Sequence, residues 1–444
     1  MQHESRNISM LMDFYEMTMA HGYFTKLKNV DRVAFDVFFR RNPDKGGFAI
    51  FGGLEQIVEY ILNLHFDESD ISYLRSQGIF SEEFLAYLKD FSFTGDVYAF
   101  PEGSIIYPNE PVITIVAPLI DAQIIETAVL TMMNHQSLIA TKANRIVRAA
   151  DGRIVADFGA RRAHNVDAAV YGARAAYIGG VQSTATVLAG QQFGIPVSGT
   201  MAHSWVMYYG SEYDAFKAYA EVYPNNAVFL VDTYDVLNSG VPNAIKVAKD
   251  VLEPMGKRLK GIRLDSGDLA YLAKKARRML DDAGLEDCKI MASNSLDEYT
   301  ITSLLIQGGP IDIFGVGERL ITSKSDPVFG AVYKIASIEK DGMWEPRIKI
   351  SESVEYIDPE QPWRELYFEN CTFKEMKQLI IKDGKLVVDL PTLEEIRAYV
   401  QDQLANEIWP EEQRFENPHR HYLDMSPSYY QLKMDLLNRI YRKK

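Results

Sequence analysis

Cysteines and long apolar runs are scarce in this sequence. Its 444 residues include two cysteines, Cys288 and Cys371, which are too far apart for a CxxC motif. This scarcity argues against a disulfide framework and against a cysteine-based zinc cluster. No run of 18 apolar residues occurs, and the first residues lack the apolar core of a signal peptide. We therefore expect a cytoplasmic protein that does not enter a membrane.

An excess of basic residues is also missing. The chain has 47 Lys and Arg against 61 Asp and Glu, a formal net charge of -14. An acidic surface repels nucleic acids and anionic membranes, so we expect neither as a partner. An anionic ligand would have to be met by local cations.

A third absence is local. Residues 175–211 contain no Asp, Glu, Lys or Arg, although charged residues make up 24% of the chain. Burial in helices and strands explains most of these positions. It does not explain the polar uncharged run at 182–186 or the glycine-rich approach to His203. A pocket wall without carboxylates would suit a negatively charged ligand.

The patterns of apolar residues divide the chain into three segments. Residues 1–118 mix helical and strand-like patterns, which predicts an α+β domain. Residues 119–338 alternate short strands with helices, including a helix at 183–193 and a strand at 195–198. This alternation predicts parallel strands with right-handed crossovers in an α/β barrel. Residues 339–444 return to strand-like segments and end in two helices, and we expect this segment to pack on the N-terminal domain.

Six strands of the middle segment run into polar or glycine-bearing turns. In βα folds such turns lie at the carboxyl ends of the strands and converge on one crevice. The crevice would then carry the function. The turns are 157–162, 198–204, 232–235, 263–268, 293–295 and 315–317.

His203 is the candidate reactive group. A histidine at a strand end can act as acid, base or nucleophile near neutral pH if a carboxylate holds its other ring nitrogen. Asp232 and Asp235, after the next strand, are both candidates for that carboxylate. A lone histidine is more often structural, but these neighbouring aspartates favour a functional one.

Two further turns carry cations beside other polar groups. Arg161 could bind a carboxylate or phosphate, and Phe158 offers a flat face to a ring, although a surface ion pair and a core phenylalanine explain them equally well. Arg263 could meet an anionic ring substituent. Asp265 stands too early to cap the next helix and could hold ribose hydroxyls or approach Mg²⁺ on a diphosphate. Asp268 is better explained as that helix cap.

The last two turns predict a phosphate site. Ser293 and Asn294 precede a helix, whose N-terminal amides favour an anion. Gly315 and Gly317 let backbone amides approach a phosphate closely. Turn chemistry alone could explain either motif, but α/β barrels commonly bind phosphate at these last two units.

Together with residues 13–19, 38–41 and 329–330, these motifs resemble the nicotinate phosphoribosyltransferases of the type II phosphoribosyltransferase group over nearly the whole chain. The resemblance implies an irregular α/β barrel, with an α+β domain formed by the N-terminal segment and the C-terminal tail. It implies a homodimer with shared active sites. The implied reaction joins nicotinate to 5-phosphoribosyl 1-diphosphate, giving nicotinate mononucleotide and diphosphate for NAD biosynthesis. ATP hydrolysis drives it, and Mg²⁺ is required.

The resemblance also implies roles for single residues. His203 would become a phosphohistidine, oriented by Asp235. Arg263 would contact substrate, Asp265 would hold ribose, and Mg²⁺ would bind mainly through the substrate diphosphate. Tyr15 from the neighbouring subunit would sandwich the pyridine ring with Phe158. The implied substrate-binding set is Tyr15, Phe158, Arg161, Ser183, Thr184, Ser293, Asn294, Gly315 and Gly317.

Nicotinate is favoured over nicotinamide because relatives specific for nicotinamide have an aspartate among the residues that correspond to 182–186. Here that run offers only uncharged groups such as Ser183 and Thr184. Since a pyridine nitrogen needs no general base, His203 is better explained as a phosphate carrier. Two alternatives stay open at this point: a nicotinamide phosphoribosyltransferase, and a noncatalytic barrel that binds a phosphorylated metabolite.

Overall fold

The computed structural model describes most of the chain, and Cys371 lies outside the described residues. The chain forms two compact units, one of residues 1–138 with 328–444 and one of residues 139–327. The segment boundaries predicted at 118 and 338 stay a prediction beside this division. The described residues are 6–27, 31–348, 368–369, 372–373, 376–421, 423 and 427–441.

The first unit is built on a seven-stranded antiparallel sheet in the order β13-β12-β1-β5-β3-β16-β17. Alternate residues of β1 are buried, so one face of the strand meets the core. Phe35 of β1 stacks on Tyr333 of β12, with ring centroids 4.6 Å apart. The early and late parts of the chain thus share one sheet and one core. The strands are β1 (Arg32–Phe38), β3 (Asp96–Ala99), β5 (Ile113–Pro118), β12 (Val332–Lys340), β13 (Met343–Pro346), β16 (Gln378–Lys382) and β17 (Lys385–Leu386).

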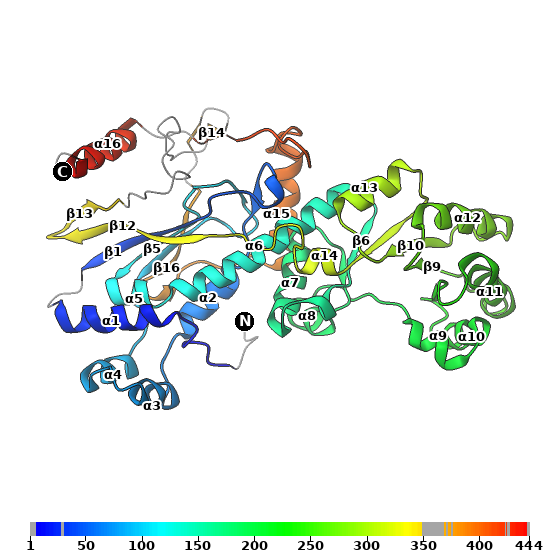
Figure 1. Ribbon diagram of the computed structural model, residues 1–444, viewed down its shortest axis with the longest axis horizontal. Coiled ribbons are helices and arrows are strands. Elements are labelled where there is room, and N and C mark those ends of the chain that lie inside the picture. Colours follow the sequence, from blue (N-terminus) through cyan, green and yellow to red (C-terminus); the bar gives the residue numbers. More distant parts are fainter. Residues whose placement is uncertain are drawn as a thin grey trace. The chain divides into compact units, whose positions relative to one another are not determined.

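Helices and two small sheets complete this unit. Helices α1 and α5 pack against each other, and α5 contacts β1 and β5 (Figure 1). The helices are α1 (Phe14–Lys26), η1 (Pro43–Lys45), α2 (Leu54–Asn63), α3 (Glu68–Ser76), α4 (Glu82–Lys89), α5 (Leu119–Gln123), α15 (Leu393–Asn406) and α16 (Pro427–Tyr441). The small sheets pair β2 (Ala49–Ile50) with β4 (Ile105–Ile106), and β14 (Phe368–Glu369) with β15 (Thr372–Phe373).

The second unit holds a six-stranded parallel sheet in the order β7-β6-β11-β10-β9-β8. Except for β7 and β8, strands that follow one another in the sequence are neighbours in the sheet, and the last strand, β11, pairs with the first, β6. This order is a ring opened at one seam. The strands are β6 (Ile154–Asp157), β7 (Ser183–Thr184), β8 (Val228–Leu230), β9 (Gly261–Leu264), β10 (Lys289–Ser293) and β11 (Ile313–Val316).

The seam lies between β7 and β8, where a single bridge joins Thr184 to Val197. The predicted strand at 195–198 is reduced to this bridge, and the predicted helix at 183–193 is wrong at its start. There β7 runs over Ser183–Thr184, and the helix begins only at Val187. The parallel, sequentially ordered strands nevertheless confirm the predicted α/β class with an irregular barrel.

Helices follow the strands of the second unit, and α12 packs on β9 and β10 (Figure 1). The long helix α6 (Glu126–Ala149) leads into this unit. The others are η2 (Ala160–Arg162), α7 (Val166–Ile178), α8 (Val187–Phe193), α9 (His203–Tyr209), α10 (Glu212–Val222), η3 (Val236–Gly240), α11 (Val241–Val247), η4 (Ala248–Leu252), η5 (Glu253–Met255), α12 (Leu269–Asp282), α13 (Glu298–Ile306) and α14 (Glu318–Ile321).

Candidate active site

His203 lies against a buried aspartate. Its Nε2 atom is 3.2 Å from Oδ1 of Asp232, whose side chain is 1% exposed. The other oxygen of Asp232 accepts hydrogen bonds from Ser266 Oγ at 2.6 Å and from the Asp265 backbone N–H at 3.2 Å. Because these contacts fix the carboxylate, Asp232 can hold the imidazole ring in one orientation.

Asp235 is used differently. Its carboxylate accepts from the backbone N–H groups of Leu237 and Asn238, at 3.0 and 2.8 Å, and from the Asn238 side chain at 3.0 Å. It thereby caps η3, and the hydrogen bonds from Asn238 lower its pKa. The structure thus pairs His203 with Asp232 and occupies Asp235 with a helix start. A catalytic role for Asp235 stays a prediction.

Arg263 on β9 is a half-buried cation whose buried Nε atom is an unsatisfied donor. Its Nη2 donates to the carbonyl of Met201 at 3.2 Å, and its Nε has no partner among the described residues. Burial lowers the pKa of Arg263, and the nearby charge of Arg161 lowers it further, whereas Asp265 and Asp232 oppose both effects. Arg161 and Arg263 therefore act on one region, where an anionic ligand could satisfy the free N–H.

Asp265 is held by the neighbouring strand end. It accepts a short hydrogen bond from Ser293 Oγ, and Ser293 is 3% exposed at the end of β10. The predicted helix cap, Asp268, is confirmed, since its side chain accepts from the N–H of Tyr271 at 3.0 Å. Asp265 is therefore not the helix cap, and its carboxylate lies beside Ser293 at the end of β10.

Phe158 lies over the end of β11. Its backbone N–H donates to the carbonyl of Val316 at 2.7 Å, and a Cβ atom on Gly315 would be 2.6 Å from the ring. Glycine at 315 therefore makes room for this ring, a reason that the sequence motif alone did not give. Gly317 adjoins the same loop, since a Cβ there would be 3.1 Å from the Phe158 carbonyl oxygen.

The turn after β10 has an unusual backbone. Asn294 and Ser295 both have positive φ angles, 83° and 50°. Two successive left-handed residues without glycine are costly, and such strain persists only where the surrounding structure enforces it. Helix α13 starts after this turn, with Asp297 as its cap through the N–H of Thr300 at 2.8 Å.

The uncharged stretch supplies two hydroxyl groups with different roles. Thr184 is buried and donates to Asp157 at 2.7 Å, and burial raises the pKa of that aspartate. Ser183 is half-buried, with its Oγ 2.7 Å from Ser198 Oγ. Ser183 is thus the better placed of the two to face a ligand.

Two polar groups at this rim, Ser266 and Thr233, were not among the residues predicted from the sequence. Ser266 anchors the Asp232 carboxylate, and its place inside the 263–268 turn was the available signal. Thr233 carries a buried hydroxyl without a hydrogen-bond partner among the described residues. It directly follows Asp232 in a turn already singled out.

Tyr15 belongs to the first unit, in α1, where 44% of it is exposed. Burial of its hydroxyl and the nearby Glu126 raise its pKa, so the phenol stays protonated at neutral pH. In the described part of the chain, no cluster of three or more His, Cys, Asp or Glu could hold a metal ion. Nor does any described helix have the length and apolar character needed to cross a membrane.

Comparisons with known proteins match nearly the whole chain. The nicotinate phosphoribosyltransferase N-terminal domain matches residues 10–134, the nicotinate phosphoribosyltransferase family residues 154–351, and the corresponding C-terminal domain residues 341–433. Nicotinate phosphoribosyltransferase of Bacillus subtilis is 42% identical, over 98% of this chain and 96% of the relative.

Solved structures agree with this match. Human nicotinic acid phosphoribosyltransferase superposes with a TM-score of 0.82 at 28% identity, over 96% of this chain and 100% of the human chain. Nicotinate-nucleotide pyrophosphorylase from Pyrococcus furiosus gives a TM-score of 0.69 at 26% identity, over 90% of this chain and 95% of that one.

Proposed function

Because this chain belongs to the nicotinate phosphoribosyltransferase family, we propose that it transfers the phosphoribosyl group of 5-phosphoribosyl 1-diphosphate to the ring nitrogen of nicotinate. The products are nicotinate mononucleotide and diphosphate, in the biosynthesis of NAD. ATP is the co-substrate that drives the reaction. Neither alternative considered above, the nicotinamide enzyme or a noncatalytic barrel, is favoured by these relatives.

The observation that carries this proposal is a chain of contacts along the strand ends of the second unit. His203 contacts Asp232, which accepts from the N–H of Asp265, and Asp265 accepts from Ser293. Ser293 is the register partner of Gly315, on which Phe158 packs. All these groups therefore lie along one rim, as a site for one extended substrate requires.

The chemistry asks for anchors at both ends of the sugar. Loss of diphosphate from C1 of ribose builds positive charge on the sugar, so the phosphate and the ring hydroxyls must be held while the leaving group is neutralised. We assign the phosphate to the 293–295 and 315–317 turns and the ribose to Asp265. The pyridine ring would lie on Phe158, with Arg161 and Arg263 meeting anionic groups.

His203 acts as a phosphate carrier in this proposal. Since Nε2 faces Asp232, Nδ1 is the nitrogen left to attack the γ-phosphate of ATP, with ADP as leaving group. Water later hydrolyses the phosphohistidine to free histidine and phosphate. Mg²⁺ fits the site mainly through the diphosphate of the substrate, because Asp232 and Asp265 already accept hydrogen bonds from protein groups.

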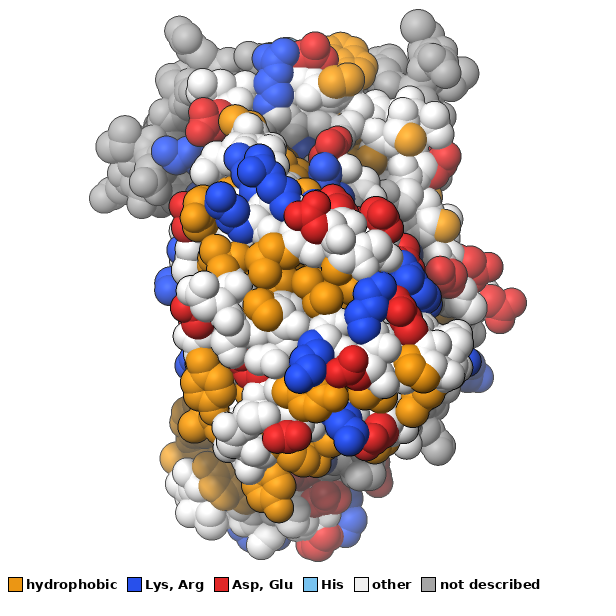
Figure 2. All heavy atoms as spheres, turned by 90° about the vertical axis from the view of Figure 1, so that its right-hand side faces the viewer, with side chains coloured by type: hydrophobic (Ala, Val, Ile, Leu, Met, Phe, Trp, Pro, Cys, Tyr) orange, Lys and Arg blue, Asp and Glu red, His pale blue; other side chains and the backbone are white. Residues whose placement is uncertain are grey.

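We also propose a cytoplasmic homodimer with shared active sites, to which Tyr15 of a second copy contributes. Exposed apolar side chains of the second unit support an interface. Figure 2 shows hydrophobic side chains gathered between charged ones on one face. The exposed apolar residues of α8 and α9 include Val187 (73% exposed), Leu188 (42%), Met207 (63%) and Tyr208 (85%).

Diphosphate release is the test of the activity. The enzyme should release diphosphate with nicotinate and phosphoribosyl diphosphate, faster with ATP, and not with nicotinamide or quinolinate. Release with nicotinamide alone would support the alternative enzyme, and no release with any base would support a noncatalytic barrel. Incubation with ATP labelled at the γ-phosphate should label His203, and label at another residue would refute the carrier role.

A further inference from the structure

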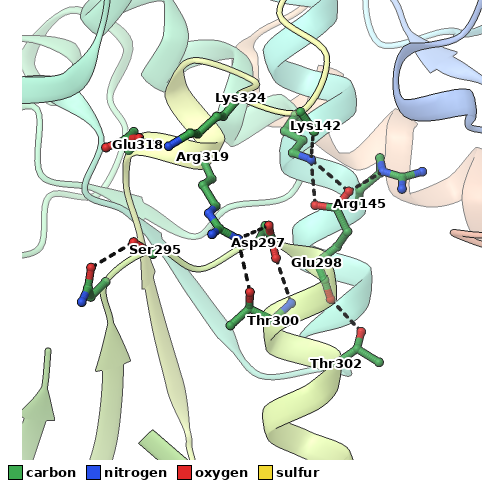
Figure 3. Close-up of polar contacts among 12 residues, drawn as sticks. Lys142, Arg145, Ser295, Asp297, Glu298, Thr300, Thr302, Glu318, Arg319 and Lys324 are labelled. Atoms are coloured by element: carbon green, nitrogen blue, oxygen red, sulfur yellow. Dashed lines mark hydrogen bonds and ion pairs between the residues drawn. The ribbon is translucent and has the colours of Figure 1, made fainter. Parts of the chain in front are cut away.

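An ion pair joins the two turns that we assign to the substrate phosphate. Arg319 of α14 donates through Nη1 to the carboxylate of Asp297, the cap of α13, in a short contact. The same nitrogen lies 3.4 Å from Thr300 Oγ1. Figure 3 shows Arg319 reaching from its helix toward Asp297 and Thr300. The 315–317 turn leads directly into α14, and the 293–295 turn leads into α13, so this pair ties the two turns together.

Asp297 is charged under ordinary conditions. Burial works against its ionisation, but hydrogen bonds from Thr300 and the contact with Arg319 outweigh burial and lower its pKa. The side chain of Asp297 is 16% exposed and that of Arg319 is 34% exposed. The pair is therefore partly shielded from water, where an ionic contact constrains geometry more than it does at a free surface.

Helix α13 is itself anchored to α6 by buried ion pairs. The next residue after the cap, Glu298, is fully buried, and Lys142 Nζ lies 2.9 Å from each of its carboxylate oxygens. Arg145 Nε donates to the same carboxylate at 2.8 Å. Lys142 also donates to Ser325 Oγ at 2.7 Å, beyond the end of α14. Helix α13 and the segment just beyond α14 are thus both fixed to α6, and Figure 3 shows Lys142 and Arg145 beside Glu298.

The strained turn needs such an anchor. Asn294 and Ser295 hold left-handed backbone angles between two fixed points, the strand register at Ser293 and the capped start of α13. Strain of this kind persists only when both sides are constrained. If α13 moved, the turn would relax and its backbone amides would change direction.

We propose that Asp297 and Arg319 are positioning residues for the phosphate of 5-phosphoribosyl 1-diphosphate. They set the separation and the orientation of the two phosphate turns without touching the reacting atoms. The inference rests on the proposed location of the phosphate at these turns. It predicts a specific loss of affinity for the phosphorylated sugar, with little effect on the binding of nicotinate.

The test compares Asp297→Asn and Arg319→Gln with wild-type enzyme. Asparagine retains the helix cap while it removes the charge, so α13 should still form. Each variant should raise the KM for phosphoribosyl diphosphate about tenfold, a typical effect of a displaced positioning group. The KM for nicotinate and the melting temperature should change little. Arg319→Lys should recover part of the affinity.

A double variant tests whether Asp297 and Arg319 act together through their ion pair or independently. If the pair acts as one unit, Asp297→Asn combined with Arg319→Gln should cost no more than either change alone. Additive losses, or an Arg319→Gln loss far above that of Asp297→Asn, would overturn the proposal in favour of direct phosphate binding by Arg319.

Lys324→Gln is the matched control. It removes the ion pair with Glu318, 2.7 Å long and largely exposed, just beyond the same helix. This variant should retain wild-type constants. Folded Asp297→Asn and Arg319→Gln enzymes with an unchanged KM for phosphoribosyl diphosphate would contradict the proposal.

Gly317→Ala distinguishes this failure from a failure of the proposed phosphate site. It would place a Cβ atom 3.1 Å from the Phe158 carbonyl oxygen, in the turn that we assign to the phosphate. A raised KM for phosphoribosyl diphosphate in this variant alone would support the phosphate site and refute the positioning role of the ion pair between Asp297 and Arg319. If no variant in either turn changes that KM, the assigned phosphate location is wrong.

Discussion

The sheets of the two units serve different purposes. In the first, an antiparallel sheet closes over aromatic pairs such as Phe39 on Phe329, with ring centroids 4.7 Å apart. In the second, parallel strands end at one rim, where polar contacts run from strand to strand. Parallel strands bring all their carboxyl ends to the same edge, so one unit supplies packing and the other a line of functional groups.

The largest expected effect comes from breaking the His203 contact. Asp232→Asn should reduce phosphohistidine formation by about 10² to 10⁴, because the imidazole loses the carboxylate that orients it. Asp235→Asn should have a much smaller effect, since asparagine can still cap η3. Transfer of label from ATP measures both. Equal losses in the two variants would mean that the contact of His203 with Asp232 in the ligand-free structure is not the one used in the reaction.

The buried ions of the second unit set the next largest effect. Glu298→Gln leaves Lys142 and Arg145 beside a neutral group, and removal of one member of a buried ion pair costs about 3 to 5 kcal/mol. The free energy of unfolding, measured in denaturant, should fall by that amount. An exposed counterpart, Glu68→Gln beside Lys89, should change it by less than about 1 kcal/mol. Similar losses in both variants would contradict this account.

The first unit holds a buried acid, Glu16, whose pKa is raised. Burial raises the pKa of Glu16 to about 7, although its hydrogen bonds with Thr127 and with Asp13 oppose this. The folded state therefore holds the proton more tightly, and stability should decrease as pH rises from about 4.5 to about 7. The full decrease is on the order of 3 kcal/mol.

Glu16→Gln should remove this decrease. Unfolding midpoints at pH 5 and pH 8 should then differ less than they do in the wild-type protein. A variant that retains the full wild-type difference would show that another group titrates in this range.

The smallest effect concerns the choice of base. Ser183→Asp should raise the KM for nicotinate about tenfold, because a carboxylate beside the half-buried site repels the substrate carboxylate. Ser183→Asn is the neutral control of similar size. Thr184 is a poorer position for this test, since its hydroxyl is bonded to the buried Asp157. Unchanged steady-state constants for Ser183→Asp would remove the uncharged wall as the source of specificity.

The positions of the strand ends were easier to predict from the sequence than the side-chain contacts between neighbouring strand ends. Five of the six polar turns follow strands of the second unit, namely β6, β8, β9, β10 and β11, whereas the 198–204 turn follows residues that form only a bridge. The pairing of His203 with Asp232 was not predictable, since both aspartates follow the same strand and only the backbone path decides which one faces the histidine. The position of Asp235 before a helix start was a usable signal for a cap.

The errors near the seam have a similar origin. Residues 183–184 pair with β6, and the polar run at 182–186 has no apolar pattern that would distinguish this short strand from the start of α8. Contacts such as Ser183 with Ser198, or Asp297 with Arg319, join residues from different βα units. No local pattern reports such contacts.

A crystal structure with bound nicotinate mononucleotide tests the central claim most directly. We predict the pyridine ring on Phe158, the ribose hydroxyls at Asp265, and the phosphate between the 293–295 and 315–317 turns. A nucleotide bound away from the strand ends of the second unit would contradict the account.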